Sequence, residues 1–236
     1  TLAARTAVGH HLDELKLLGE ELSMSTRLMS PDDPIYALAE VSRDDAAGDE
    51  PFRVAIKRIR SRLVSTGTRM FGDEVMRVVD QAPFPDAEPY ASADEFLADL
   101  DVIDAGLRST RDDIIADDRL LSLREAVRTF GFHLSGLDMR QNSDMHEEVI
   151  AELLAWSGVH PDYLSLGEAE RVEILTKELT ARRPLTRPDA ELSELATKEL
   201  NIVRAAARAV ATFGPQSVPN YIISMCQSVS DMFEPM

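Results

Sequence analysis

Apolar residues recur at helical spacing through the first half of the chain. One such stripe lies between residues 2 and 28, and another follows Pro51, a residue that suits the first position of a helix. Ser92 and Glu95 form a capping box ahead of a third stripe. Pro83, Pro85 and Pro89 predict a loop with a short helix over residues 71–90. The first two stripes consist of Val8, Leu12, Leu15, Leu18 and Leu22, and of Phe52, Ala55, Ile56, Ile59 and Leu63. Residues 1–129 are therefore predicted to form a helical region.

The pattern changes over residues 130–141, which begin apolar and end polar. This segment is predicted to be a parallel strand buried on both faces. Alternate residues of a strand share a face, so Asp138 and Arg140 would project together at its carboxyl end. Ligands bind at that end in parallel α/β folds, and a guanidinium suits phosphate or carboxylate. The alternative is that Arg140 pairs with Asp138 in a structural network, and the spacing alone favours this alternative.

A second buried strand is predicted over residues 220–226, after Pro219. Three helical segments lie between the two strands, the last of them over residues 190–213, where Leu195, Leu200, Val203 and Ala207 are expected to face inward. Strands joined through helices are typically parallel. Because two strands do not close a sheet, the pattern predicts a piece of a longer protein.

Composition narrows the function classes. The 236 residues carry a formal charge of −17, which argues against a nucleic-acid or anionic membrane partner. Cys226 is the only cysteine, which excludes an internal disulfide and favours a reducing cytoplasm. No apolar run reaches the length of a membrane span. Glycine-rich phosphate loops and histidine pairs at metal-ligand spacing are absent from the sequence.

One strongly basic segment stands out, and it contains Arg53, Lys57, Arg58, Arg60 and Arg62. Most of these side chains are expected to lie on a solvated face and to pair with nearby acids. A minority interpretation is an anion site that uses one or two of them.

Several motifs, in order along almost the whole chain, resemble the phosphoenolpyruvate carboxylase family of the bacterial, actinobacterial type. They are Glu21–Ser25, Pro51–Arg53, Lys57–Leu63, Phe130–Gly131, Leu137–Ser143, Lys177–Leu179, Arg182–Leu185, Tyr221–Met225 and Ser230–Asp231.

The resemblance implies a fold and a reaction. The fold is mainly α with a few parallel strands, part of a helix-rich (β/α)8 TIM-like barrel whose first strands lie within residues 130–236. The complete enzyme is expected to be a cytoplasmic, allosteric homotetramer. It would use Mg²⁺ or Mn²⁺ to join phosphoenolpyruvate to bicarbonate, giving oxaloacetate and phosphate for the tricarboxylic acid cycle.

The resemblance also implies roles for individual residues. Arg140 matches the arginine of the family's D-x-R-Q motif, which binds the phosphate of phosphoenolpyruvate, and Asp138 would orient it. Arg60 is the nearest match to arginines that bind a sugar-phosphate activator in plant members. The family's catalytic histidines, metal-binding carboxylates and mobile glycine-rich loop have no counterpart here. We therefore expect no catalytic residue and no metal ligand in this chain, and no activity from it alone. The competing hypothesis is a helical scaffold or oligomerisation module without catalysis.

Overall fold

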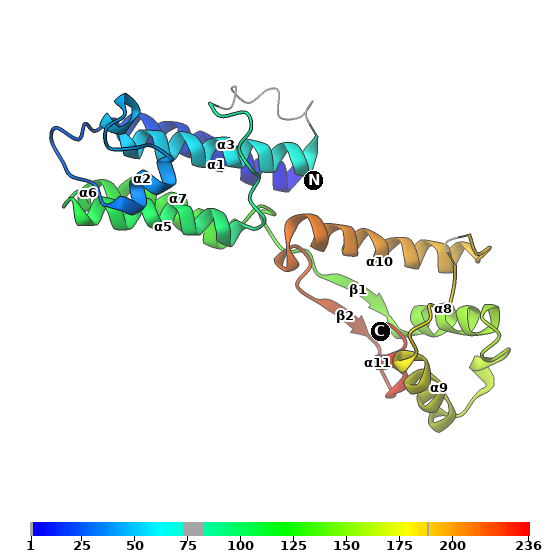
Figure 1. Ribbon diagram of the computed structural model, residues 1–236. Coiled ribbons are helices and arrows are strands. Elements are labelled where there is room, and N and C mark those ends of the chain that lie inside the picture. Colours follow the sequence, from blue (N-terminus) through cyan, green and yellow to red (C-terminus); the bar gives the residue numbers. More distant parts are fainter. Residues whose placement is uncertain (1, 73–82, 188) are drawn as a thin grey trace. The chain divides into compact units, whose positions relative to one another are not determined.

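The computed structural model describes residues 2–72, 83–187 and 189–236, and it consists of helices and one short sheet (Figure 1). Its contacts divide the chain into two compact units. We call residues 1–136 with 212–217 the helical unit, and residues 137–211 with 218–236 the strand unit. The predicted class, mainly α with parallel strands, is confirmed.

The helical unit follows the apolar stripes of the sequence. Pro51 is the first residue of its long third helix, as predicted, but the first helix ends at Glu21 rather than near residue 28. Of the predicted loop over residues 71–90, positions 73–82 lie outside the described residues, and positions 83–86 form bends and turns. The elements are α1 (Leu2–Glu21), α2 (Asp33–Ala39), η1 (Ala46–Asp49), α3 (Pro51–Phe71), α5 (Ala93–Ser109), α6 (Asp113–Ile115), η2 (Ala116–Leu120), α7 (Leu121–Phe130) and η4 (Pro215–Ser217).

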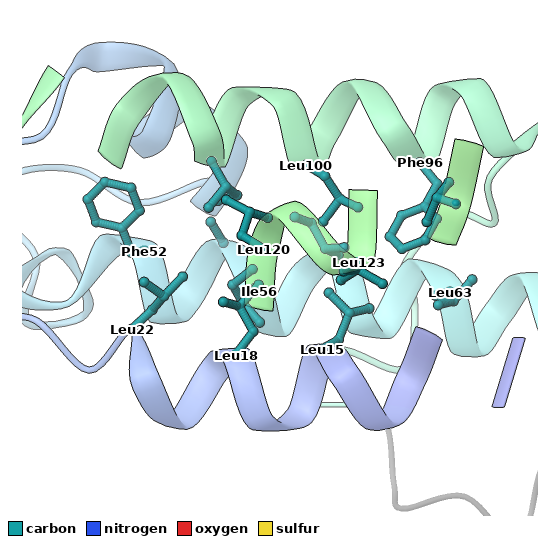
Figure 2. Packing of buried hydrophobic residues seen from close by; sticks show 14 of the residues in the cluster. Leu15, Leu18, Leu22, Phe52, Ile56, Leu63, Phe96, Leu100, Leu120 and Leu123 are labelled. Atoms are coloured by element: carbon teal, nitrogen blue, oxygen red, sulfur yellow. The ribbon is translucent and has the colours of Figure 1, made fainter. Parts of the chain in front are cut away.

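The core of the helical unit lies where α1, α3, α5 and α7 meet (Figure 2). Leu15 and Leu18 of α1 and Ile59 of α3 have no exposed surface. Each fully buried side chain of this size stabilises the fold by about 1.5–3 kcal/mol. The helical unit therefore has a core of its own.

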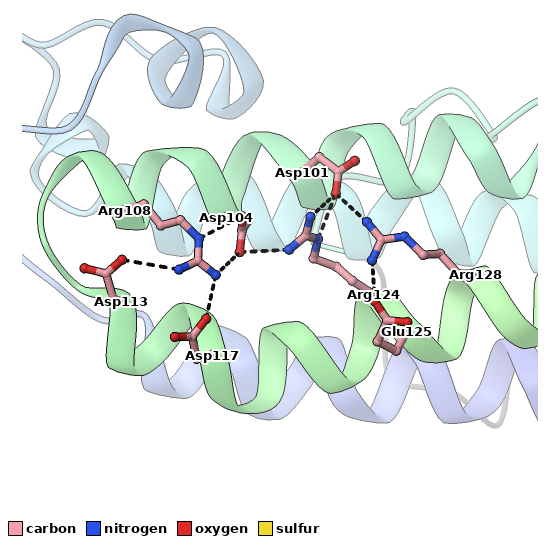
Figure 3. Close-up of polar contacts among 8 residues, drawn as sticks. All are labelled: Asp101, Asp104, Arg108, Asp113, Asp117, Arg124, Glu125 and Arg128. Atoms are coloured by element: carbon pink, nitrogen blue, oxygen red, sulfur yellow. Dashed lines mark hydrogen bonds and ion pairs between the residues drawn. The ribbon is translucent and has the colours of Figure 1, made fainter.

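Arginines and aspartates join α5 to the segment that contains η2 and α7 (Figure 3). Arg124 contacts Asp101 at 2.7 Å and Asp104 at 2.8 Å, and its side chain is 13% exposed. Arg108 reaches Asp104 and Asp117 from the other side. A network of partly buried pairs restrains helices more effectively than isolated surface pairs do.

The strand unit contains a two-stranded parallel sheet. Met139 pairs with Tyr221, and the register continues to Asn142 opposite Ser224. Helices α8, α9 and α10 make the connection between the strands that a parallel pair requires. The elements are β1 (Met139–Asn142), α8 (Ser143–Trp156), η3 (Tyr163–Ser165), α9 (Glu168–Thr180), α10 (Glu194–Phe213), of which residues 212 and 213 belong to the helical unit, β2 (Tyr221–Ser224) and α11 (Ser230–Phe233).

The prediction of a strand over residues 130–141 is wrong for most of its length. Helix α7 continues to Phe130, and β1 begins only at Met139. Gly131 has φ 47° and ψ −133°, a conformation that favours glycine and ends the helix. Phe132 then stacks on Phe96 in the helical core, and His11 Nε2 lies 2.9 Å from the carbonyl oxygen of Gly131. These contacts hold the segment in the helical unit instead of a sheet.

The second strand is also shorter than predicted, since β2 covers Tyr221–Ser224 of the expected 220–226. The expectation for the helix after residue 190 is wrong at two positions: Val203 is 45% exposed and Ala207 is exposed as well. Leu195 and Leu200 do pack, as expected, against the small core around Val149 and Ala196.

Candidate functional site

The candidate site lies on β1 and is centred on Arg140. Side chains alternate along this strand, with Met139 and Gln141 partly buried and Arg140 and Asn142 exposed. The side chain of Arg140 is 71% exposed. Its guanidinium therefore keeps most of its donors available to a ligand.

Asp138 lies close to Arg140 but also contacts Asn220, the residue before β2. Its Oδ2 is 4.0 Å from Arg140 Nη2, the outer limit of an ion pair, while its Oδ1 accepts a hydrogen bond of 3.0 Å from Asn220 Nδ2. An exposed pair at this distance contributes little to stability. The geometry brings the two predicted residues together, with Arg140 only loosely held. The prediction that both lie at the carboxyl end of their strand is wrong, because Asp138 precedes β1 and Arg140 is its second residue.

Helix α8 begins directly after β1, so its amino terminus follows Arg140 by three residues. Free amides at such an end attract anions. However, Asp144 occupies one of them, since its Oδ1 accepts a hydrogen bond of 2.9 Å from the Met145 amide. The Oγ of Ser143 instead donates a hydrogen bond of 3.1 Å to the carbonyl oxygen of Met225, the residue after β2. The helix end is therefore only partly available to an anion.

On the opposite side of β1, four polar side chains form a layer that we call the buried polar layer: Gln141, His146, Glu199 and Tyr221. Gln141 Nε2 donates to Glu199 Oε2 at 2.9 Å, and Tyr221 Oη shares a hydrogen bond of 2.9 Å with His146 Nε2. Burial lowers the pKa of His146, and the charge of Glu199 opposes this shift. Burial and the same charge raise the pKa of Tyr221.

Glu199 was not among the residues of α10 that were predicted to face inward. It is 5% exposed, although acids on helices usually face solvent. Its spacing from Leu195 and Ala196, four and three residues earlier, places it on the inward side of α10 and was the available signal.

Arg60 lies elsewhere, in the helical unit. It is 8% exposed and lines a groove of about 510 Å³ between α1 and α3. Lys16, Arg53 and Lys57 contribute further positive charge to this groove, and Glu20 contributes negative charge. The expectation that most cations of this helix pair with acids is confirmed for three of them: Arg53 with Glu50, Arg58 with Glu40, and Arg62 with Glu95 and Asp99.

Residues 1–236 match a family model described as phosphoenolpyruvate carboxylase. The chain belongs to the phosphoenolpyruvate carboxylase family. A relative of that name from Mycolicibacterium paratuberculosis is 55% identical over 232 residues, covering 98% of this chain and 24% of the relative. One from Nocardia farcinica is 56% identical over 236 residues, covering 99% of this chain and 25% of the relative. One from Corynebacterium glutamicum is 42% identical over 237 residues, covering 99% of this chain and 26% of the relative. The chain spans about a quarter of the length of these phosphoenolpyruvate carboxylases.

Family membership raises the question of a divalent metal. Among residues 2–72, 83–187 and 189–236, no three His, Cys, Asp or Glu side chains are placed to hold one ion. The residues that the structure describes therefore do not fit a metal centre. None of the described helices combines the length and the hydrophobicity of a membrane span.

Proposed function

We propose that this chain supplies the phosphate-binding arginine of a phosphoenolpyruvate carboxylase, and that this residue is Arg140. The observation that carries the proposal is the exposed guanidinium on the second residue of a parallel strand, in a chain that belongs to this family. A planar fork of donors suits a phosphate group, and fixed positive charge stabilises a phosphoryl group during its transfer.

In the complete enzyme, phosphoenolpyruvate and bicarbonate would react to give oxaloacetate and phosphate. The role of Arg140 would be to bind and orient the phosphate while it moves to bicarbonate, with Asp138 limiting the positions that the guanidinium adopts. The strand unit would form part of a (β/α)8 barrel in a cytoplasmic homotetramer. Mg²⁺ or Mn²⁺ would be held by residues outside this chain.

The proposal is tested by Arg140→Ala in the complete enzyme. Loss of a charged phosphate contact of ~1.5–3 kcal/mol would raise the KM for phosphoenolpyruvate and lower turnover by roughly 10- to 100-fold in kcat/KM. Arg140→Lys keeps the charge without the fork and should recover only part of the loss. Arg204→Ala on α10 is the matched control, because this exposed arginine contacts only Asn201 in the described hydrogen bonds.

The melting temperature distinguishes this proposal from the scaffold hypothesis. Arg140 is exposed and weakly paired, so its removal should leave the melting temperature within about 1 °C of the parent enzyme. An unfolded variant whose surviving fraction has normal kinetics would instead favour a scaffold role. Oxaloacetate formation by the isolated 236-residue chain with bicarbonate and magnesium would contradict the proposal that the chain is inactive alone.

The groove around Arg60 supports a second proposal, an effector site for a phosphorylated small molecule. Four cationic side chains and one acid, Glu20, line this groove, in a chain whose formal net charge is −17. Titration calorimetry with a sugar phosphate should give binding that Lys57→Ala weakens. Equal affinity of the variant and the parent enzyme for the sugar phosphate would contradict an effector site in this groove.

A further inference from the structure

Strand β1 is only four residues long, and side-chain hydrogen bonds connect it to its surroundings. The side-chain amide of Gln141 makes two of these hydrogen bonds. Its Nε2 donates to Glu199 Oε2 at 2.9 Å, and its Oε1 accepts from the backbone N–H of Asn142 at 3.0 Å. Gln141 therefore links a carboxylate on α10 to the backbone at the end of β1.

Burial of the Glu199 carboxyl group is energetically unfavourable. Glu199 is 5% exposed, and its Oε1 has no hydrogen-bond partner among the described residues. Burial of a polar atom without a partner is unfavourable by an amount similar to a lost hydrogen bond. A hydrophobic residue at this position of α10 would avoid that cost, so packing alone does not explain Glu199.

These hydrogen bonds of Gln141 affect the position of Arg140. This residue immediately precedes Gln141 and projects to the other side of the strand. Among the described residues its side chain makes one ion pair, a weak one with Asp138 at 4.0 Å. The direction in which the guanidinium leaves the strand is therefore set by the backbone of β1, which Gln141 and Glu199 hold.

We propose that Glu199 is a positioning residue for substrate: through Gln141 it fixes the end of β1 and so the placement of Arg140. The inference rests on the proposed function of Arg140. Glu199 touches neither substrate nor reacting atoms in this account. It acts through one hydrogen bond, for which a neutral acceptor of the same shape suffices.

The test uses the complete enzyme with Glu199→Ala and Glu199→Gln. Glu199→Ala should raise the KM for phosphoenolpyruvate roughly three- to tenfold, the range expected for one hydrogen bond, and leave the KM for bicarbonate unchanged. Glu199→Gln retains an acceptor for Gln141 and should stay within about twofold of the parent enzyme. Glu194→Ala, an exposed acid on the same helix, is the matched control.

Three results would overturn the inference: equal changes in both KM values, no change with Glu199→Ala, or a Glu199→Gln variant as impaired as Glu199→Ala. Should Glu199→Ala fail to fold, Glu199→Met fills similar space without the acceptor and tests the same hydrogen bond.

A double-mutant cycle separates this inference from the proposed function. If Glu199 acts through Arg140, then Glu199→Ala should have no further effect on the KM for phosphoenolpyruvate in an Arg140→Ala background. Additive effects would overturn the positioning role while leaving the role of Arg140 intact. An Arg140→Ala enzyme with unchanged kinetics would overturn the proposed function itself.

Discussion

A buried carboxyl group should make the strand unit sensitive to pH near neutrality. Glu234, after α11, is 4% exposed, and its Oε1 accepts a hydrogen bond of 2.9 Å from Tyr163 Oη. Burial raises the pKa of Glu234 to about 7, the Tyr163 bond opposes the shift, and the charges of Glu147 and Asp231 add to it. Arg171, which pairs with Glu147, also lowers the pKa. The neutral acid is thus the form that suits this site.

The sign of the pH dependence follows from proton binding. Between the ordinary pKa of 4.5 and the folded value of about 7, the folded state binds more protons than the unfolded state. The free energy of unfolding therefore falls as the pH rises through this window, and it levels off above pH 7. The shift corresponds to roughly 3 kcal/mol, most of which is lost between pH 5 and 8.

Trp156 provides the assay, because it is the only tryptophan of the chain and ends α8 in the strand unit. Urea unfolding followed by its fluorescence would be measured from pH 5 to 8 for the parent chain and Glu234→Gln. The glutamine variant keeps the acceptor for Tyr163 but does not titrate. The difference between the two curves cancels other groups, including His146, whose pKa burial lowers. We expect this difference to change by about 2–3 kcal/mol across the range.

Glu148→Gln is the matched control, since Glu148 is an exposed acid on α8. Its pH dependence should coincide with that of the parent chain. The reasoning is refuted if Glu234→Gln and the parent chain show parallel curves.

Three further predictions concern the helical unit. Burial lowers the pKa of His11, so stability should fall as the pH drops below about 6.5, and His11→Gln should reduce this loss in thermal melts followed by circular dichroism. Leu18→Ala should cost about 2–5 kcal/mol in chemical unfolding, and a cost below 1 kcal/mol would contradict the packing described here. Arg124→Ala should cost about 1–3 kcal/mol because it breaks two partly buried pairs. Arg43→Ala removes an exposed pair with Asp33, together with contacts to the Pro31 carbonyl and the Tyr36 ring, and should cost less, about 1 kcal/mol.

The helices of the helical unit could be predicted because apolar stripes determine which face is buried. The stripe containing Leu15 and Leu18 and the proline at position 51 were sufficient to predict the body of α1, though not its end at Glu21, and the start of α3. The strand over residues 130–141 was predicted wrongly because a short apolar run does not distinguish a strand from a loop that packs into a core. Gly131 was the missed signal, since its backbone conformation ends α7.

The candidate site was only partly accessible from sequence. Family motifs pointed to Arg140 and Asp138, and the structure places both at β1; their roles stay proposals. The contact between Gln141 and Glu199 joins residues 58 positions apart, and no local pattern predicts such a pair. The spacing of Glu199 from Leu195 and Ala196 indicates an inward position on α10, but not its partner on β1.

The parallel pairing of β1 with β2 implies a delay during synthesis, because the sheet cannot form until both strands have been made. Asp138 and its partner Asn220 are 82 positions apart, as are Ser143 and Met225. At roughly 5–20 residues per second, a ribosome needs on the order of 4–16 s to make the chain between them. During that interval β2, the strand that pairs with β1 among the described residues, has not been made, whereas α8 and α9 have their local hydrogen bonds available at once. The surface that carries Arg140 would therefore be completed late, after the helices between the two strands have emerged.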